Sequence, residues 1–226
     1  ALFAACPPVY ATCFSGFYLA IMLVLFGLII RAVAVEFRGH GEEPAKLWDG
    51  CFFIGSLLPA LLFGVALGDV LAGIPLNMYG DYTGNFFGLL TAFGLDCGIL
   101  GLVHMLMQGA SWLAAKAPAG DPLRAKCIRL RKTFAIAGLG VFAICTVIYF
   151  AMVVPNSSIG LGVNFIAVIG AGLYVASTVG VLLMKDDVKV DIFGPVLATV
   201  GCAGLVVTVA ASMFPYIVPA TDPLFS

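Results

Sequence analysis

Six long apolar runs with few or no charged residues restrict what this sequence can fold into. About 20 consecutive apolar residues make a helix that crosses the roughly 30 Å hydrocarbon core of a membrane. Only 10% of the residues are charged, against about a quarter in soluble domains. The sequence therefore predicts one all-α domain over residues 1–226, a polytopic transmembrane helix bundle. Its six spans are expected at about 9–35, 51–69, 85–115, 133–154, 161–184 and 192–213.

The basic residues predict the orientation, because Lys and Arg in short loops mark the cytoplasmic side of a membrane. The 11 Lys and Arg residues fall in alternate gaps between spans. They are Arg31, Arg38 and Lys46, then Lys116, Arg124, Lys126, Arg129, Arg131 and Lys132, then Lys185 and Lys189. We therefore expect a multi-pass membrane protein with both ends of this sequence on the outer side. Residues Lys116–Lys132 are interpreted as a plain cytoplasmic linker.

The sequence begins in the middle of an apolar pattern, without an initiator Met or a positively charged leader. We expect a longer protein, of which this sequence is incomplete at both ends. Seven cysteines are scattered without a metal-ligand spacing, and we interpret them as small apolar residues, not as disulfides or metal ligands. The charge pattern gives no indication of nucleic-acid binding.

Arg31 stands inside the first apolar run, where an ionisable group costs about 2.5–3.5 kcal/mol. Counted from residue 9, it lies about 33 Å along the helix, near the inner edge of the core. It could be a membrane anchor with its guanidinium among lipid headgroups. It could instead be buried against protein, since four apolar residues follow it, with Glu36, Asp49 or an acidic group of a bound molecule as acceptor.

The third run carries the other polar candidates. Asp96 is expected near the outer boundary and His104 near the midplane. His104 and Gln108 are four residues apart, so they share one helix face. A midplane histidine could relay protons or bind haem iron, but we favour a neutral core residue hydrogen-bonded to a neighbouring helix. Asp69, after the second run, is expected to be a solvated outer cap.

Two pairs of glycines at a spacing of four, Gly64 with Gly68 and Gly94 with Gly98, predict close helix contacts.

Several stretches together resemble a known membrane family. They are "ALFAACPPVYATCFSGFYLAIMLVLFGLIIRAVAVEFR", "LWDGCFFIGSLLPALLFGVALGDVLAGIPLN", "YTGNFFGLLTAFGL", "QGASWLAAK" and "ASMFPYIVPA". The sequence resembles subunit II of the cytochrome bd-type quinol oxidases over nearly its whole length. The specific elements are Arg31 with Glu36, Phe37 and Arg38, the Trp48-Asp49 pair, and the MFPYIVP end.

The resemblance implies a nine-helix subunit of the bacterial inner membrane, of which this sequence supplies the third to eighth helices. It implies a partner, subunit I, that carries haem b and haem d, in a complex that oxidises quinol, reduces oxygen to water and contributes to the membrane potential. This chain would bind no haem itself. Some family members hold a structural quinone, and a small single-span subunit is a further expected partner besides membrane lipid. Arg31, Glu36, Arg38, Trp48 and Asp49 would support the haem-bearing interface, with Asp49 as the expected partner of Arg31.

Two other interpretations remain open from the residues alone. One is a proton-coupled secondary transporter that uses His104 and an Arg31–Asp49 pair as gates. The other is a membrane scaffold without chemistry of its own. His104 and Gln108 are the candidates for a proton path or a polar core.

Overall fold

The computed structural model describes residues 7–39, 45–77, 90–118, 120–153, 165–184 and 191–214, together with residues 4, 82 and 88. In these residues the chain is mainly helical, and Leu76 and Tyr82 form an isolated β-bridge. The helices are α2 (Pro7–Gly16), α3 (Tyr18–Phe37), α4 (Ala45–Ala72), α5 (Ala92–Lys116), α6 (Pro122–Ile148), α8 (Phe165–Leu183) and α10 (Phe193–Met213), with a π-helical turn, η2 (Tyr149–Val153), continuing α6.

Six of the described helices, all except α2, are long and apolar enough to cross a membrane. The prediction of an all-α, polytopic transmembrane bundle is therefore confirmed. The expected fifth and sixth spans agree with α8 and α10 to within a few residues at the ends that the structure describes.

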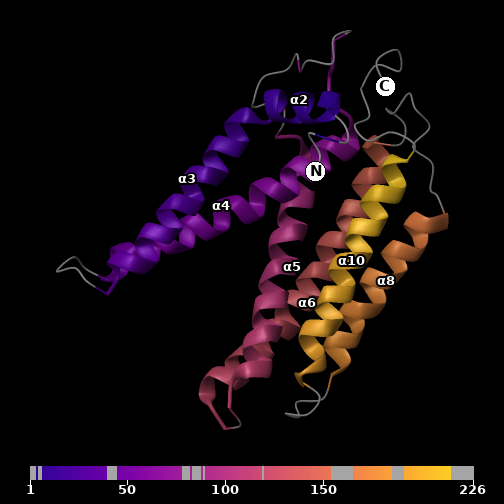
Figure 1. Cartoon of the computed structure of the whole chain (residues 1–226). Coiled ribbons are helices and arrows are strands. Elements are labelled where there is room, and N and C mark those ends of the chain that lie inside the picture. Colours follow the sequence, from indigo (N-terminus) through magenta and orange to yellow (C-terminus); the bar gives the residue numbers. More distant parts are fainter. Residues whose placement is uncertain are drawn as a thin grey trace.

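The expected first span is wrong at its beginning, because the chain bends at Phe17 and forms two helices. Figure 1 shows the short α2 running across the top of α3. Phe17 is 6% exposed and packs with Ala20 and Ile74, and this contact holds the bend. Apolar content alone does not distinguish a helix that lies across the bundle from one that spans the membrane. Arg31 is therefore about 20 Å from the start of α3 and about 9 Å from its end.

The expected linker Lys116–Lys132 is also wrong. Helix α5 ends at Lys116, and α6 begins at Pro122, eleven residues before the predicted span. Asp121 caps α6 by accepting a hydrogen bond from the Leu123 N–H at 2.8 Å, and proline is well suited to the first helical position. The basic residues of this segment thus lie on a helix with a defined buried face.

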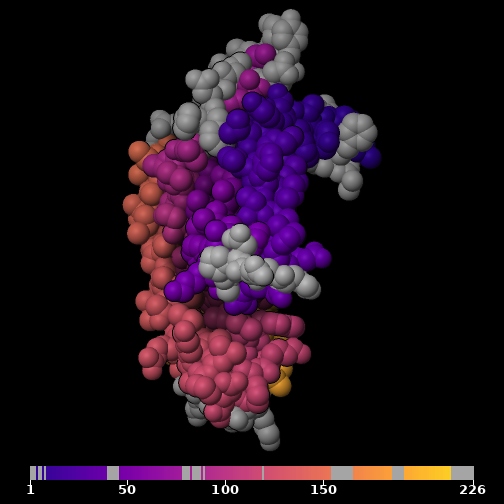
Figure 2. All heavy atoms as spheres, turned by 90° about the vertical axis from the view of Figure 1, so that its left-hand side faces the viewer, coloured from indigo at the N-terminus to yellow at the C-terminus, as the bar shows by residue number. Residues whose placement is uncertain are grey.

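The helices form two groups (Figure 1). Helices α3 and α4 pair with each other and extend to one side as an arm, which we call the α3–α4 arm. Helices α5, α6, α8 and α10 form the main bundle, in which α5 contacts α4, α6 and α10. Figure 2 shows the arm in front of the bundle.

The arm joins the bundle where α4 crosses α5, and the predicted glycine pairs form this crossing. A Cβ added to Gly64 would lie 2.7 Å from the Cα of Gly98, and one added to Gly68 would lie 2.9 Å from the Cα of Gly94. Neither separation is tolerated, so the two backbones approach closely only because side chains are absent. The predicted close helix contacts are confirmed.

Candidate functional site

Arg31 is exposed on the α3–α4 arm, at membrane depth. Its backbone packs against α4, since a Cβ on Gly55 would lie 2.9 Å from the Arg31 nitrogen. Its guanidinium carbon lies 5.6 Å from the centre of the Phe52 ring on α4. The ring supplies a cation–π contact but no hydrogen-bond acceptor of the kind that a guanidinium needs away from water.

Asp49 was the expected partner of Arg31, and the structure pairs it with Arg38 instead. The Arg38 Nε donates to Asp49 Oδ1 at 2.8 Å, and the two side chains are 61% and 53% exposed. Arg31 lies almost two helical turns before Arg38, about 10 Å along α3, so Asp49 at the start of α4 is level with Arg38.

The other residues expected near Arg31 lie at the same end of the arm. Trp48 stacks on Phe37 with ring centres 5.5 Å apart. Glu36 is exposed on α3. The Trp48–Phe37 stack and the Arg38–Asp49 pair join the two helices to each other, while the Arg31 guanidinium lies over Phe52.

The arm also exposes many large apolar side chains. Phe26, Phe53 and Phe63 are 62%, 64% and 61% exposed. Others are Met22, Leu25, Ile29, Val35, Ile54 and Leu67. Figure 2 views the molecule from the side on which the arm lies. Lipid or another protein can cover such a surface, but an arginine among apolar residues favours protein.

The main bundle contains a buried ion cluster that the sequence analysis missed. Arg131 Nη1 donates to Asp191 Oδ1 at 2.9 Å, and Arg124 Nη2 donates to Asp191 Oδ2 at 2.5 Å. The side chains of Arg131 and Asp191 are 0% and 1% exposed. Arg124 and Arg131 are seven residues apart, so both lie on one face of α6. The seven-residue spacing could have predicted that these two arginines share a helix face. The interpretation of Lys116–Lys132 as a linker excluded that prediction.

Gly194 on α10 makes room for this cluster. A Cβ added there would lie 3.1 Å from Arg131 Nη1. The cluster therefore joins the first turns of α6 to the start of α10, with one carboxylate bonded to two guanidinium groups.

His104 and Gln108 share a face of α5, as the spacing predicted, and this face packs on α10. Gln108 Nε2 donates to Thr199 Oγ1 at 3.0 Å. His104 is 3% exposed, and its ring lies 5.8 Å from the Tyr174 ring on α8. A Cβ on Gly201 would lie 3.3 Å from His104 Cε1, so α10 closes over the ring. The surroundings are those of a core residue.

Asp69 was expected to be solvated, and this prediction is wrong. It is 3% exposed and accepts a hydrogen bond from Thr91 Oγ1 at 2.7 Å. Thr91 in turn caps α5 by accepting from the Gly94 N–H at 2.9 Å. Helix α4 continues past Asp69 to Ala72, and the carboxylate meets the N-terminus of α5, whose dipole favours a negative charge.

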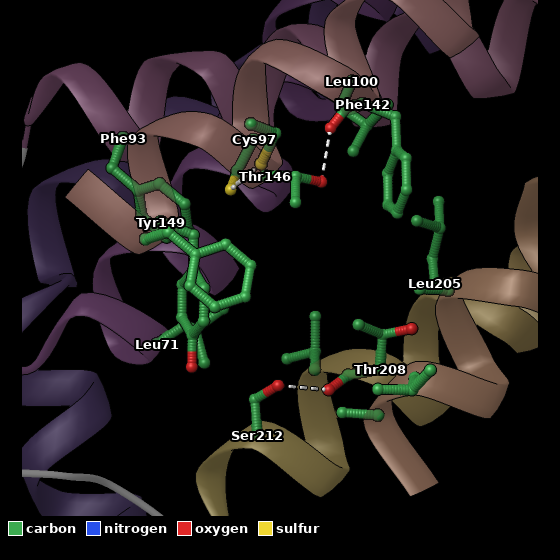
Figure 3. Close-up of a pocket in the computed structure, with 16 residues that line it drawn as sticks. Leu71, Phe93, Cys97, Leu100, Phe142, Thr146, Tyr149, Leu205, Thr208 and Ser212 are labelled. Carbon is green, nitrogen blue, oxygen red and sulfur yellow. Dashed lines mark hydrogen bonds between the residues drawn. The ribbon is translucent and has the colours of Figure 1, made fainter. Parts of the chain in front are cut away.

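An apolar cavity of about 290 Å³ lies within the main bundle, next to the end of α4. Figure 3 shows Phe93 and Cys97 of α5, Phe142 of α6, Tyr149 of η2 and Leu205 of α10 around it. The hydroxyls of Thr146, Thr208 and Ser212 donate to carbonyls of their own helices, at 2.8 Å each. The cavity therefore suits an apolar group.

These features define a multi-pass membrane protein with a self-contained bundle and an arm that presents an arginine and an apolar face. The chain belongs to the family described as cytochrome bd terminal oxidase subunit II, whose model matches residues 1–225. This confirms the resemblance seen in the sequence.

Curated relatives agree with this membership. The chain is 33% identical over 249 aligned positions to a probable cytochrome oxidase subunit 2 of Haemophilus influenzae, covering 98% of this chain and 66% of the relative. It is 47% identical over 121 positions to the cytochrome bd-I ubiquinol oxidase subunit 2 of Escherichia coli, covering 50% of this chain and 31% of the relative. The Bacillus subtilis cytochrome bd ubiquinol oxidase subunit 2 is 42% identical over 79 positions, 34% of this chain and 23% of the relative. The chain thus spans less than two thirds of the length of these relatives.

Proposed function

We propose that this chain is part of subunit II of a cytochrome bd-type quinol oxidase and packs through its α3–α4 arm against a haem-bearing subunit I. The complex oxidises quinol, reduces oxygen to water and contributes to the membrane potential. The observation that carries this proposal is the exposed Arg31 on an apolar face at membrane depth.

An arginine within a span needs an acceptor, and the described part of the arm gives Arg31 a ring while Asp49 is bonded to Arg38. A carboxylate or carbonyl of a partner subunit would meet this need. The neighbouring exposed aromatic residues supply the contact area of an interface. Arg31 is therefore a positioning residue for the partner, and Glu36, Arg38, Trp48 and Asp49 keep the arm in shape.

We further propose that haem b and haem d belong to the partner. The His104 ring is enclosed by Tyr174 and Gly201 and does not fit an axial ligand, which needs open space at a ring nitrogen. The apolar cavity fits a structural quinone, whose ring or tail Phe93, Tyr149 and Leu205 would hold.

We assign the basic helix ends to the cytoplasmic side and the opposite ends to the outer side, on the charge distribution. Helices α3 and α5 both run downward in Figure 1, away from the end of the molecule that carries α2. Arg38, Lys46, Lys116 and Arg124 flank the connections from α3 to α4 and from α5 to α6. In this assignment a small single-span subunit would bind on the lipid-facing surface.

The test is an Arg31→Leu variant of the complete oxidase, with the exposed Arg129→Leu on α6 as the matched control. We expect the reduced-minus-oxidised spectrum of purified complex to show less haem d in Arg31→Leu, while the subunit still inserts into the membrane. Arg129→Leu should leave the spectrum unchanged. Equal spectra in both variants would contradict the role given to Arg31.

A proton-coupled transporter was the alternative interpretation. It needs a hydrated midplane group, whereas His104 is packed between three helices. Substrate uptake by this chain alone in liposomes would support the transporter and contradict the oxidase proposal.

A further inference from the structure

Two cysteines from different helices meet at the wall of the apolar cavity. The Sγ atoms of Cys97 on α5 and Cys145 on α6 are 3.6 Å apart, and both side chains line the cavity. The distance is that of two thiols in van der Waals contact, and a disulfide requires about 2.05 Å. A movement of about 1.5 Å would therefore suffice to form the bond.

The surrounding helices hold this pair in place. A Cβ on Gly68 would lie 2.7 Å from Cys97 Cβ and 3.0 Å from its Sγ, so the α4 backbone closes one side of Cys97. Cys97 is thus fixed on one side by protein, and both thiols face the apolar cavity.

We infer that Cys97 and Cys145 form a reversible disulfide that links α5 covalently to α6 at the cavity wall. The oxidant in this proposal is an apolar quinone. Two S–H bonds break and one S–S bond forms. The quinone takes up the two electrons and two protons and becomes a hydroquinone. The proposal concerns the interior of the bundle and does not depend on what covers the arm.

Two properties favour this reaction at this pair. Preorganised thiols react with each other at a high effective concentration, because their approach costs little further entropy. The apolar wall admits a lipid-soluble oxidant and excludes charged ones. Cys51, Cys127 and Cys202 lie on α4, α6 and α10 without a described sulfur contact, so they serve as controls.

The test uses membranes that contain the complete oxidase, treated with duroquinone, a fully substituted quinone that cannot add to a thiol. After denaturation, free thiols are counted by maleimide labelling and the linkage is mapped by peptide mass spectrometry. We expect a loss of two thiols per subunit, a linked Cys97–Cys145 peptide pair, and recovery of both thiols on reduction.

Cys97→Ser and Cys145→Ser should each lose no thiols, whereas Cys202→Ser should lose two like the parent. Glutathione disulfide, which is charged, should oxidise the pair at least tenfold more slowly. An unchanged thiol count in the parent, or a linkage between other cysteines, would overturn the inference. Equal rates with duroquinone and glutathione disulfide would overturn the assigned route through the cavity.

Discussion

The α3–α4 arm and the main bundle differ in how their charged side chains are paired and how far they are exposed. In the bundle, the carboxylate of Asp191 is bonded to Arg124 and Arg131 with almost no exposure. In the arm, Asp49 is bonded to Arg38 in the open, and Arg31 lies over an aromatic ring at membrane depth. In the described residues, the bundle gives these two arginines a carboxylate of its own chain, whereas the arm sets Arg31 over the Phe52 ring. We propose from this difference that another subunit completes the arm.

The largest expected effect comes from removing the charge at the centre of the bundle cluster. Asp191→Asn removes the carboxylate that the described residues supply to two buried guanidinium groups, and breaking a buried ion pair in this way costs about 3–5 kcal/mol. Thermal unfolding of the purified complex in detergent should show a large fall in stability. If Asp191→Asn behaves like a surface substitution, the cluster does not stabilise the bundle.

We expect the next largest loss of stability from a substitution at the α4–α5 crossing, where the arm joins the bundle. Gly64→Ala puts a methyl group 2.7 Å from the Gly98 Cα, and such overpacking costs about 1–3 kcal/mol. The control is Gly140→Ala on α6, where a Cβ meets nothing within 4 Å. Unfolding of the two variants side by side should separate them. Equal stability would mean that the helices do not cross as closely as the structure has them.

Substitution of His104 should lower stability less than Asp191→Asn or Gly64→Ala, because His104 is a packed core residue without an ion pair. His104→Ala removes a buried ring without breaking an ion pair, and we expect a loss of about 1 kcal/mol. Haem content and quinol oxidase activity of the assembled complex should stay close to those of the parent. A complete loss of activity with normal haem content would instead place His104 on a proton path.

The smallest expected effect is that of the exposed ion pair of the arm. Asp49→Asn should cost less than about 1 kcal/mol, because solvent screens the pair, and the loss should shrink further at high salt. The same unfolding measurement at low and high salt checks this. A loss as large as that of Asp191→Asn would show that the end of the arm is buried in the complex.

The sequence predicted what depends on local pattern. Apolar runs predicted the positions of α8 and α10. The glycine spacing predicted close helix contacts, although not that α4 and α5 make them with each other, and the i, i+4 spacing placed His104 and Gln108 on one face. The features that depend on distant contacts were missed. The break at Phe17 is held by Ile74, 57 positions away, and Arg131 pairs with Asp191, 60 positions away.

The exposed arm was not predictable for a different reason. Periodicity shows which residues are apolar, but α3 is apolar on nearly every side, so the pattern does not tell which side meets α4. The contacts of Gly27 and Gly55 decide this, since a Cβ on Gly55 would lie 2.6 Å from the Gly27 carbonyl oxygen. Once these glycines face each other, Phe26 and Ile29 are left outside.

The most direct test of the central claim is site-specific photo-crosslinking in the membrane. A benzophenone amino acid replaces Phe26 on the arm, which is 62% exposed, or Val147 on α6, which is 66% exposed. We expect the label at position 26 to crosslink to the haem-bearing polypeptide in high yield, and the label at 147 to react mainly with lipid. Crosslinking to that polypeptide from 147 and not from 26 would contradict the account.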